Sequence, residues 1–189
     1  MKIIQIPGYA VIQEQDASAL SPTSSARTRL LIAATVIFTC SFVVRLGFDF
    51  AVRAYRNGPG ELRPTDRSEF VNIAETFARD GRLADPYSLP TGPTAHMPPI
   101  YPILLGSVYR VFGLGVSGEI AAHCLNIFFV SIMYALLPLA AISLGLSVRA
   151  GMLAGIMGAM VPFHVFVELR GGEYGMVGLC LVLLFLATV

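Results

Sequence analysis

Two carboxylates, Asp66 and Glu69, open a short amphipathic segment and are the residues best suited to chemistry. They stand in the stretch DRSEFVNIAETFARDG. A carboxylate that faces a cleft can take up or release a proton. At the first turn of a helix it caps backbone N–H groups instead. Spacing alone favours capping, with Thr65 or Asp66 as the N-cap and Glu69 closing a capping box.

The spacing predicts a helix over residues 66–81, which must position these two acids. Its apolar residues recur at helical intervals and form one stripe: Phe70, Ile73, Ala74, Phe77 and Ala78. Gly81 is a natural stop for this helix. Because Asp66 falls one turn before the stripe and Glu69 lies at its edge, both carboxylates are expected to point toward the surface on which the helix packs.

The segment PPIYPILLGSVYRVFG predicts a second surface helix, too short to cross a bilayer. Its apolar stripe comprises Ile100, Ile103, Leu104, Val108 and Val111. We expect this helix to lie along the bilayer, with Tyr101 and Arg110 at headgroup depth. Arg110 either pairs with a lipid phosphate or extends to water, the more common case. His96 precedes the segment in an exposed setting, as a surface residue.

Composition excludes several classes of protein. The chain has 189 residues, 55% of them hydrophobic and 13% charged, whereas soluble domains are typically about 25% charged. Mean hydropathy is +0.70. A formal net charge of +1 provides no field for nucleic acid. Cys40, Cys124 and Cys180 lie far apart inside apolar runs and indicate small buried side chains.

The apolar residues are grouped into blocks that predict four membrane spans, and so an all-α polytopic membrane protein. The blocks are Leu30–Leu46, Ile120–Leu146, Met152–Val167 and the run from Tyr174. The third block is rich in glycine, with Gly151 directly before it and Gly155 and Gly158 within it, which indicates close helix packing. Charges are expected to avoid the centres of the spans. His123 and His164 lie in or near spans, where an interhelical hydrogen bond is the expected role.

These blocks predict the organisation of the chain. Residues 1–29 form a flexible cytoplasmic tail, 30–48 the first transmembrane helix, 49–118 an external loop with interfacial helices, and 119–189 transmembrane helices two to four. Arg27 and Arg29 precede the first span, and the positive-inside rule places them in the cytoplasm. The fourth span stops abruptly at Val189, so we expect the chain to be the front part of a larger protein.

The order of these features resembles the amino-terminal third of a GT-C superfamily membrane glycosyltransferase. The closest resemblance is to the protein O-mannosyltransferase and aminoarabinose transferase group, over residues 30–189. Three features carry it: an acid that starts the first external helix, the A-x-x-x-A-R-D-G close of that helix, and PPIYP followed by an apolar helix ending in FG.

The resemblance implies roles for particular residues. Asp66 matches the first-loop aspartate taken as the catalytic base, with Glu69 as a second acid. Glu173 resembles an acid that family members often hold at the start of the fourth span. Met97 departs from the family, because a basic residue commonly precedes the PP pair. The donor phosphate is then left to the nearby His96, Arg110 and Arg170, and Tyr101 flanks the same site.

The implied reaction is inverting transfer of a sugar from a polyprenyl phosphate to an acceptor hydroxyl on the external face of the plasma membrane. The donor lipid is the expected substrate partner, no bound cofactor is assigned, and a divalent metal is left open. The fragment alone is expected to be inactive, because relatives need further spans. Two other classes fit the composition: a transporter fragment, and a non-catalytic membrane or assembly protein in which Asp66 is only a cap.

Overall fold

The computed structural model describes residues 24–56, 68–87, 89–161 and 173–189. Over these ranges the chain is helical, with a single isolated antiparallel bridge between Ala84 and Pro93 and no strand. The helices are α1 (Ser24–Arg56), α2 (Glu69–Asp80), α3 (Ile100–Phe112), α4 (Val116–Ala135), α5 (Leu137–Ser143), α6 (Val148–Met160) and α8 (Tyr174–Thr188). The predicted all-α class is therefore confirmed.

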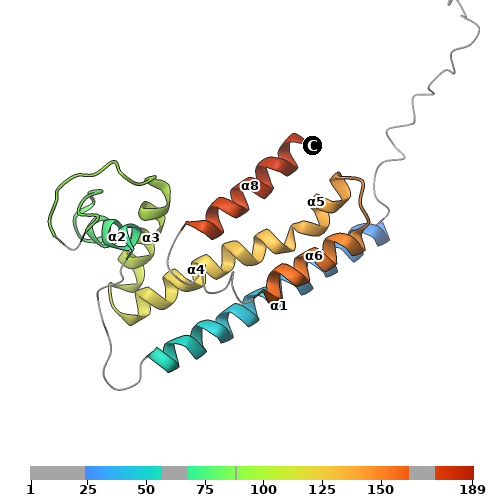
Figure 1. Cartoon of the computed structure of the whole chain (residues 1–189), viewed down its shortest axis with the longest axis horizontal. Coiled ribbons are helices and arrows are strands. Elements are labelled where there is room, and N and C mark those ends of the chain that lie inside the picture. Colours follow the sequence, from blue (N-terminus) through green and yellow to red (C-terminus); the bar gives the residue numbers. More distant parts are fainter. Residues whose placement is uncertain (1–23, 57–67, 88, 162–172) are drawn as a thin grey trace, which may run out of the picture.

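The helices form a bundle with a small two-helix unit at one end (Figure 1). Helix α4 runs through the middle and packs on α1, α6 and α8, and α1 also packs on α6. Helices α2 and α3 pack on each other beside the first turns of α4. The segments that hold the predicted site residues are thus joined to the bundle through α3 and α4.

Two helical stretches are long and apolar enough to cross a membrane, Arg27–Val52 and Val116–Ser143. Helices α6 and α8 have 13 and 15 residues, fewer than the roughly 20 that a span requires. Helix α1 begins inside the predicted tail and continues past residue 48 into the predicted loop. The first helix is therefore longer at both ends than its apolar run.

The second predicted span is divided into α4 and α5 at Leu136. Pro138 lies in the first turn of α5, where a missing N–H is tolerated. The chain then turns at Gly145, whose φ of +73° suits glycine, and returns as α6. A β-carbon on Gly155 would lie 2.9 Å from the Ile37 side chain, so α6 and α1 approach closely. The prediction of small-residue packing is confirmed here.

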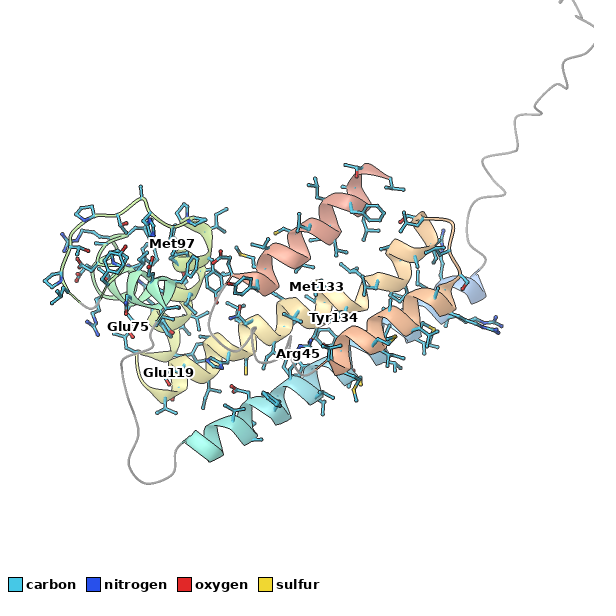
Figure 2. The ribbon with its side chains drawn as sticks, in the orientation of Figure 1. Arg45, Glu75, Met97, Glu119, Met133 and Tyr134 are labelled. Atoms are coloured by element: carbon cyan, nitrogen blue, oxygen red, sulfur yellow. The ribbon has the colours of Figure 1, made fainter. Side chains whose placement is uncertain are left out.

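Arg45 lies inside the bundle and is fully buried. It donates to the Ser41 hydroxyl and to the Ala159 carbonyl, each at 3.0 Å, and its guanidinium faces the ring of Tyr134 (Figure 2). Arg45 falls within the candidate span Arg27–Val52, toward its carboxyl end and away from its centre. Its charge is accepted there because the last carbonyls of α6 need donors.

The cysteines are less buried than expected. Cys40 and Cys124 are half-buried and Cys180 is exposed, and none of these three cysteines forms a disulfide. The prediction is wrong most clearly for Cys180, because it lies on a side of α8 that no described element covers.

Candidate functional site

Helix α2 begins at Glu69 and not at Asp66. Ser68 is the N-cap, with extended backbone, and its side chain makes no capping hydrogen bond. Glu69 is therefore the first residue of the helix, and the predicted capping box is wrong, because that motif needs the acid at the third position. Asp66 lies outside the described residues. The predicted end of the helix is confirmed: Gly81 has a φ of 72° and its N–H bonds the Phe77 carbonyl.

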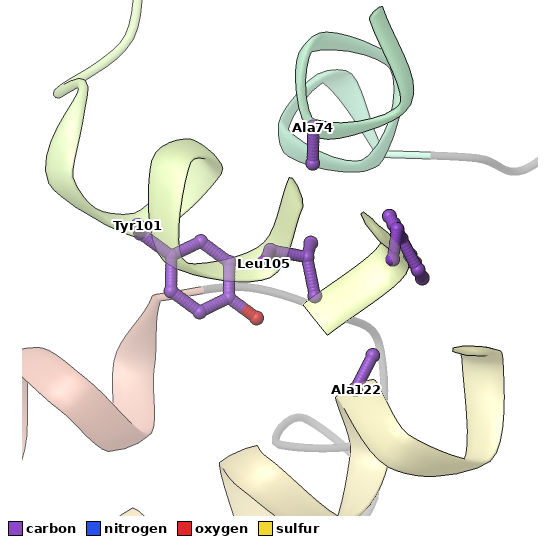
Figure 3. Packing of buried hydrophobic residues seen from close by; sticks show 5 residues of the cluster. Ala74, Tyr101, Leu105 and Ala122 are labelled. Carbon is purple, nitrogen blue, oxygen red and sulfur yellow. The ribbon is translucent and has the colours of Figure 1, made fainter. Parts of the chain in front are cut away.

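A buried apolar cluster holds α2 on α3 and α4 (Figure 3). Its buried members are Ala74, Tyr101, Leu105, Tyr109 and Ala122. The two helices meet at Gly106, where a β-carbon would lie 2.7 Å from the Ala74 carbonyl oxygen. This close contact fixes the position of Glu69 relative to α3.

Tyr101 is the centre of a buried polar group. The side-chain N–H of Asn126 donates to the Tyr101 hydroxyl at 2.8 Å, and the Phe70 ring packs edge-on against the phenol. Burial raises the pKa of Tyr101 to about 12. The hydrogen bond from Asn126 lowers this pKa by less, and the negative charge of Glu173, the smallest of the three effects, raises it. Tyr101 therefore keeps its proton at physiological pH and remains a hydrogen-bond donor.

Three buried oxygens around this unit have no hydrogen-bond partner: Glu69 Oε2, Asn126 Oδ1 and Glu173 Oε2. All three are acceptors, and they come from α2, α4 and the residue that precedes α8. Glu173 is the N-cap of α8, but its side chain makes no capping bond. Buried polar atoms are usually paired, so each unpaired oxygen requires an explanation.

His96 and Glu69 lie close together in the structure, although nothing in the sequence predicts this contact. His96 Nε2 lies 3.2 Å from Glu69 Oε2, within ion-pair distance, while the geometry makes no hydrogen bond. The imidazole is 57% exposed and the carboxylate 33%. His96 is thus exposed, as predicted, yet faces an acid of the predicted site.

Arg110 contacts the protein and serves as a cap. It donates to the Phe77 carbonyl at 2.8 Å and to the Ala78 carbonyl at 3.2 Å, and lies over the Phe77 ring. A cation at these carbonyls stabilises the carboxyl end of α2. The Nε and one terminal nitrogen of Arg110 are thereby engaged within the α2–α3 unit.

The stripe predicted for α3 lies partly on its outer side. Ile100, Ile103 and Val111 are 68%, 38% and 76% exposed. Tyr101, expected at headgroup depth, is only 1% exposed and packs inward. Helix α3 is therefore apolar on both its inner and its outer side.

A second polar pair joins α1 to α4. His123 Nδ1 lies 2.8 Å from Asp49 Oδ1, and the Asp49 side chain is 7% exposed. The expected interhelical contact of His123 is confirmed. His164 and Arg170 lie outside the described residues.

Asn126 and Asp49 are polar residues of these contacts for which the sequence predicts no role. The available signal was a polar residue within or next to a long apolar run, which is costly in a membrane unless it has a partner or a function. Nothing local in the sequence indicates that Asn126 faces Tyr101.

The described residues contain no group of three His, Cys, Asp or Glu side chains close enough to hold a metal ion. No known family model matches the chain. Searches of curated proteins and of solved structures likewise found no significant similarity.

Proposed function

We propose that the chain is part of a membrane glycosyltransferase, which moves a sugar from a polyprenyl-phosphate donor to an acceptor hydroxyl. The observation that carries this proposal is the pair of acids, Glu69 and Glu173, that each keep a buried carboxylate oxygen without a hydrogen-bond partner. They come from distant parts of the chain, Glu69 at the start of α2 and Glu173 directly before α8, and the charge of Glu173 acts on Tyr101 of α3. Glu69 Oε2 also lies within ion-pair distance of His96. Buried carboxylate oxygens that make no hydrogen bond suit a substrate rich in hydroxyl groups.

The proposed reaction is a single displacement. Asp66 removes the proton of the acceptor hydroxyl, whose oxygen then forms a bond to the anomeric carbon. The bond from that carbon to the phosphate oxygen breaks, and polyprenyl phosphate leaves with the electron pair. Attack opposite the leaving group inverts the anomeric centre. Glu69 and Glu173 hold and orient the sugar.

The proposed setting is the external face of a membrane, with the amino terminus in the cytoplasm and four crossings. Two apolar stretches of sufficient length support membrane association. The outer side of α3, with Ile100, Ile103 and Val111 exposed, supports a position of this helix against lipid. Arg79 on α2 and Arg82 just beyond it carry exposed charges, which would contact lipid headgroups or water.

One observation favours a transporter fragment as the second candidate. Arg45 and the Asp49–His123 pair place ionisable side chains inside or beside the candidate spans, as transporters often do. Arg45, however, is bonded to the carbonyls that end α6, which explains it as a structural residue. Glycosyl transfer therefore remains the favoured proposal.

The test uses the full-length natural protein in liposomes containing polyprenyl-phosphate mannose labelled in the sugar, with serine-containing peptides and lipid A as acceptors. A second series uses a polyprenyl-phosphate amino sugar. We expect protein-dependent transfer with inverted anomeric configuration in one series. A failure to release polyprenyl phosphate above the protein-free rate in both series would contradict the proposal.

A further inference from the structure

The polar group around Tyr101 contains several hydrogen-bonding atoms that have no partner. Asn126 is 6% exposed and Tyr101 is 1% exposed. The Asn126 N–H bonds the Tyr101 hydroxyl, so the amide oxygen Oδ1 is left without a donor. Glu173 Oε2 is also unpaired, and its charge acts on the Tyr101 phenol. Two buried acceptors and the phenol proton thus have no assigned partner.

The chemistry of the missing partner follows from this inventory. An acceptor amide oxygen and a carboxylate require N–H or O–H donors, and the phenol proton requires an acceptor. A sugar hydroxyl is both donor and acceptor, and an ammonium group supplies donors only. Phosphate, which accepts hydrogen bonds and is anionic, is disfavoured beside Glu173. Exposure increases from Tyr101 to the half-buried Glu173, so the ligand would approach from the start of α8.

We propose that Asn126, Tyr101 and Glu173 form a binding subsite for the sugar ring of a lipid-linked donor, recognising its hydroxyl or ammonium groups and not its phosphate. This inference rests on the proposed function for the identity of the lipid. Asn126 is the residue that this subsite adds to the proposed function, because it supplies a fully buried amide oxygen from the middle of α4. The subsite gives the protein a preference for glycosylated over bare polyprenyl phosphate.

Binding can be measured apart from reaction. The full-length protein carrying Asp66→Asn, which blocks proposed turnover, is placed in nanodiscs and titrated with polyprenyl-phosphate mannose or bare polyprenyl phosphate, with native mass spectrometry as the readout. We expect the mannosyl lipid to bind about tenfold more tightly, the equivalent of one hydrogen bond of about 1.4 kcal/mol.

The test variant is Tyr101→Phe/Asn126→Leu, which removes the polar atoms together and leaves no unpaired partner between the two residues. It should lower the preference to less than about twofold and leave the affinity for bare lipid unchanged. Ser131→Ala is the matched control, since it removes a buried hydroxyl of the same helix that bonds the Ile127 carbonyl. Its preference should equal that of the parent.

Glu173→Gln distinguishes the two kinds of donor group. The glutamine amide keeps an acceptor oxygen but loses the negative charge. The affinity for the mannosyl lipid should therefore fall less than about threefold, and the affinity for a polyprenyl-phosphate amino sugar should fall about tenfold or more. If only the affinity for the amino sugar falls strongly, Glu173 binds an ammonium group. If both affinities fall only slightly, Glu173 binds hydroxyl groups.

Two results would overturn the subsite and leave only water at these atoms. One is equal affinity of the parent for the two lipids. The other is an unchanged preference in the double variant, provided that its unfolding temperature equals that of Ser131→Ala. The proposed reaction is judged separately by transfer. If the protein prefers the mannosyl lipid to bare polyprenyl phosphate but transfers no sugar, the proposed reaction is refuted and the subsite is retained. If it transfers sugar without this preference in binding, the subsite is refuted and the reaction is retained.

Discussion

The guanidinium carbon of Arg45 lies 4.9 Å from the centroid of the Tyr134 ring, inside the helical bundle. The same guanidinium donates to the carbonyls of Gly158 and Ala159 near the end of α6. Tyr134 packs so tightly on Gly158 that no β-carbon would fit between them. A buried charge is therefore stabilised here by helix-end carbonyls and an aromatic face.

This packing predicts a large effect of Gly158→Ala. The added methyl group must displace the Tyr134 ring and disturb its contact with Arg45, so the free energy of unfolding should fall by about 2–3 kcal/mol. Gly47→Ala is the matched control, because its β-carbon meets nothing within 4 Å. It should be neutral or stabilise α1 by up to about 1 kcal/mol. Detergent-solubilised protein is unfolded with denaturant to compare them, and equal effects would refute the packing argument.

Arg110→Met should loosen the carboxyl end of α2. Loss of two carbonyl contacts at an exposed site is expected to cost about 0.5–1 kcal/mol, seen as faster amide exchange of residues 77–81. Arg82→Met is the control, because the Arg82 side chain is 71% exposed and pairs with the half-exposed Asp80 at the surface. If Arg110 instead bound the donor phosphate, exchange would be unchanged and affinity for bare polyprenyl phosphate would fall.

The pKa of Tyr101 predicts a loss of stability at high pH. The value rises from 10.0 to about 12 on folding, so the folded state holds this proton more tightly. The resulting contribution, about 2–3 kcal/mol, is fully present below pH 10 and disappears as pH rises from 10 to 12. Unfolding at several pH values is compared between the parent and Tyr101→Phe. The variant should lack this component, and parallel curves would contradict the burial of a neutral phenol.

Single tryptophans can locate the outer side of α3, because the chain contains none. Ile103→Trp and Val111→Trp place the probe on the exposed apolar side of α3, and Arg82→Trp places it at an exposed charged position just beyond α2. Brominated lipids should quench the first two strongly and the third weakly. Equal quenching of all three would show that α3 does not lie against lipid.

The helices followed from sequence where local periodicity and stop signals agree. Residues Phe70 to Ala78 repeat at helical spacing and Gly81 permits a positive φ, so the course of α2 was predictable apart from its start. Its start was misassigned because Ser68, Thr65 and Asp66 are all acceptable N-caps. The choice between such neighbours depends on how α2 docks on α3, which is not a local property.

The partners of the site residues could not be predicted, because they depend on packing between distant segments. Arg110 contacts Phe77 and Ala78 across a helix interface, and Asn126 reaches Tyr101 from α4. The helical spacing of apolar residues reveals which side of a helix is apolar. It does not reveal that α3 is buried on the side of Tyr101 and exposed on the side of Ile103.

The proposed reaction is tested most directly by the rate of sugar transfer in the full-length protein carrying Asp66→Asn. A lost general base should lower the rate by about 10²–10⁴-fold while the unfolding temperature stays unchanged. Asp80→Asn is the control, since Asp80 is half exposed at the far end of α2 and should leave the rate near normal. Transfer by Asp66→Asn at the rate of Asp80→Asn would contradict the assignment of Asp66 as the base.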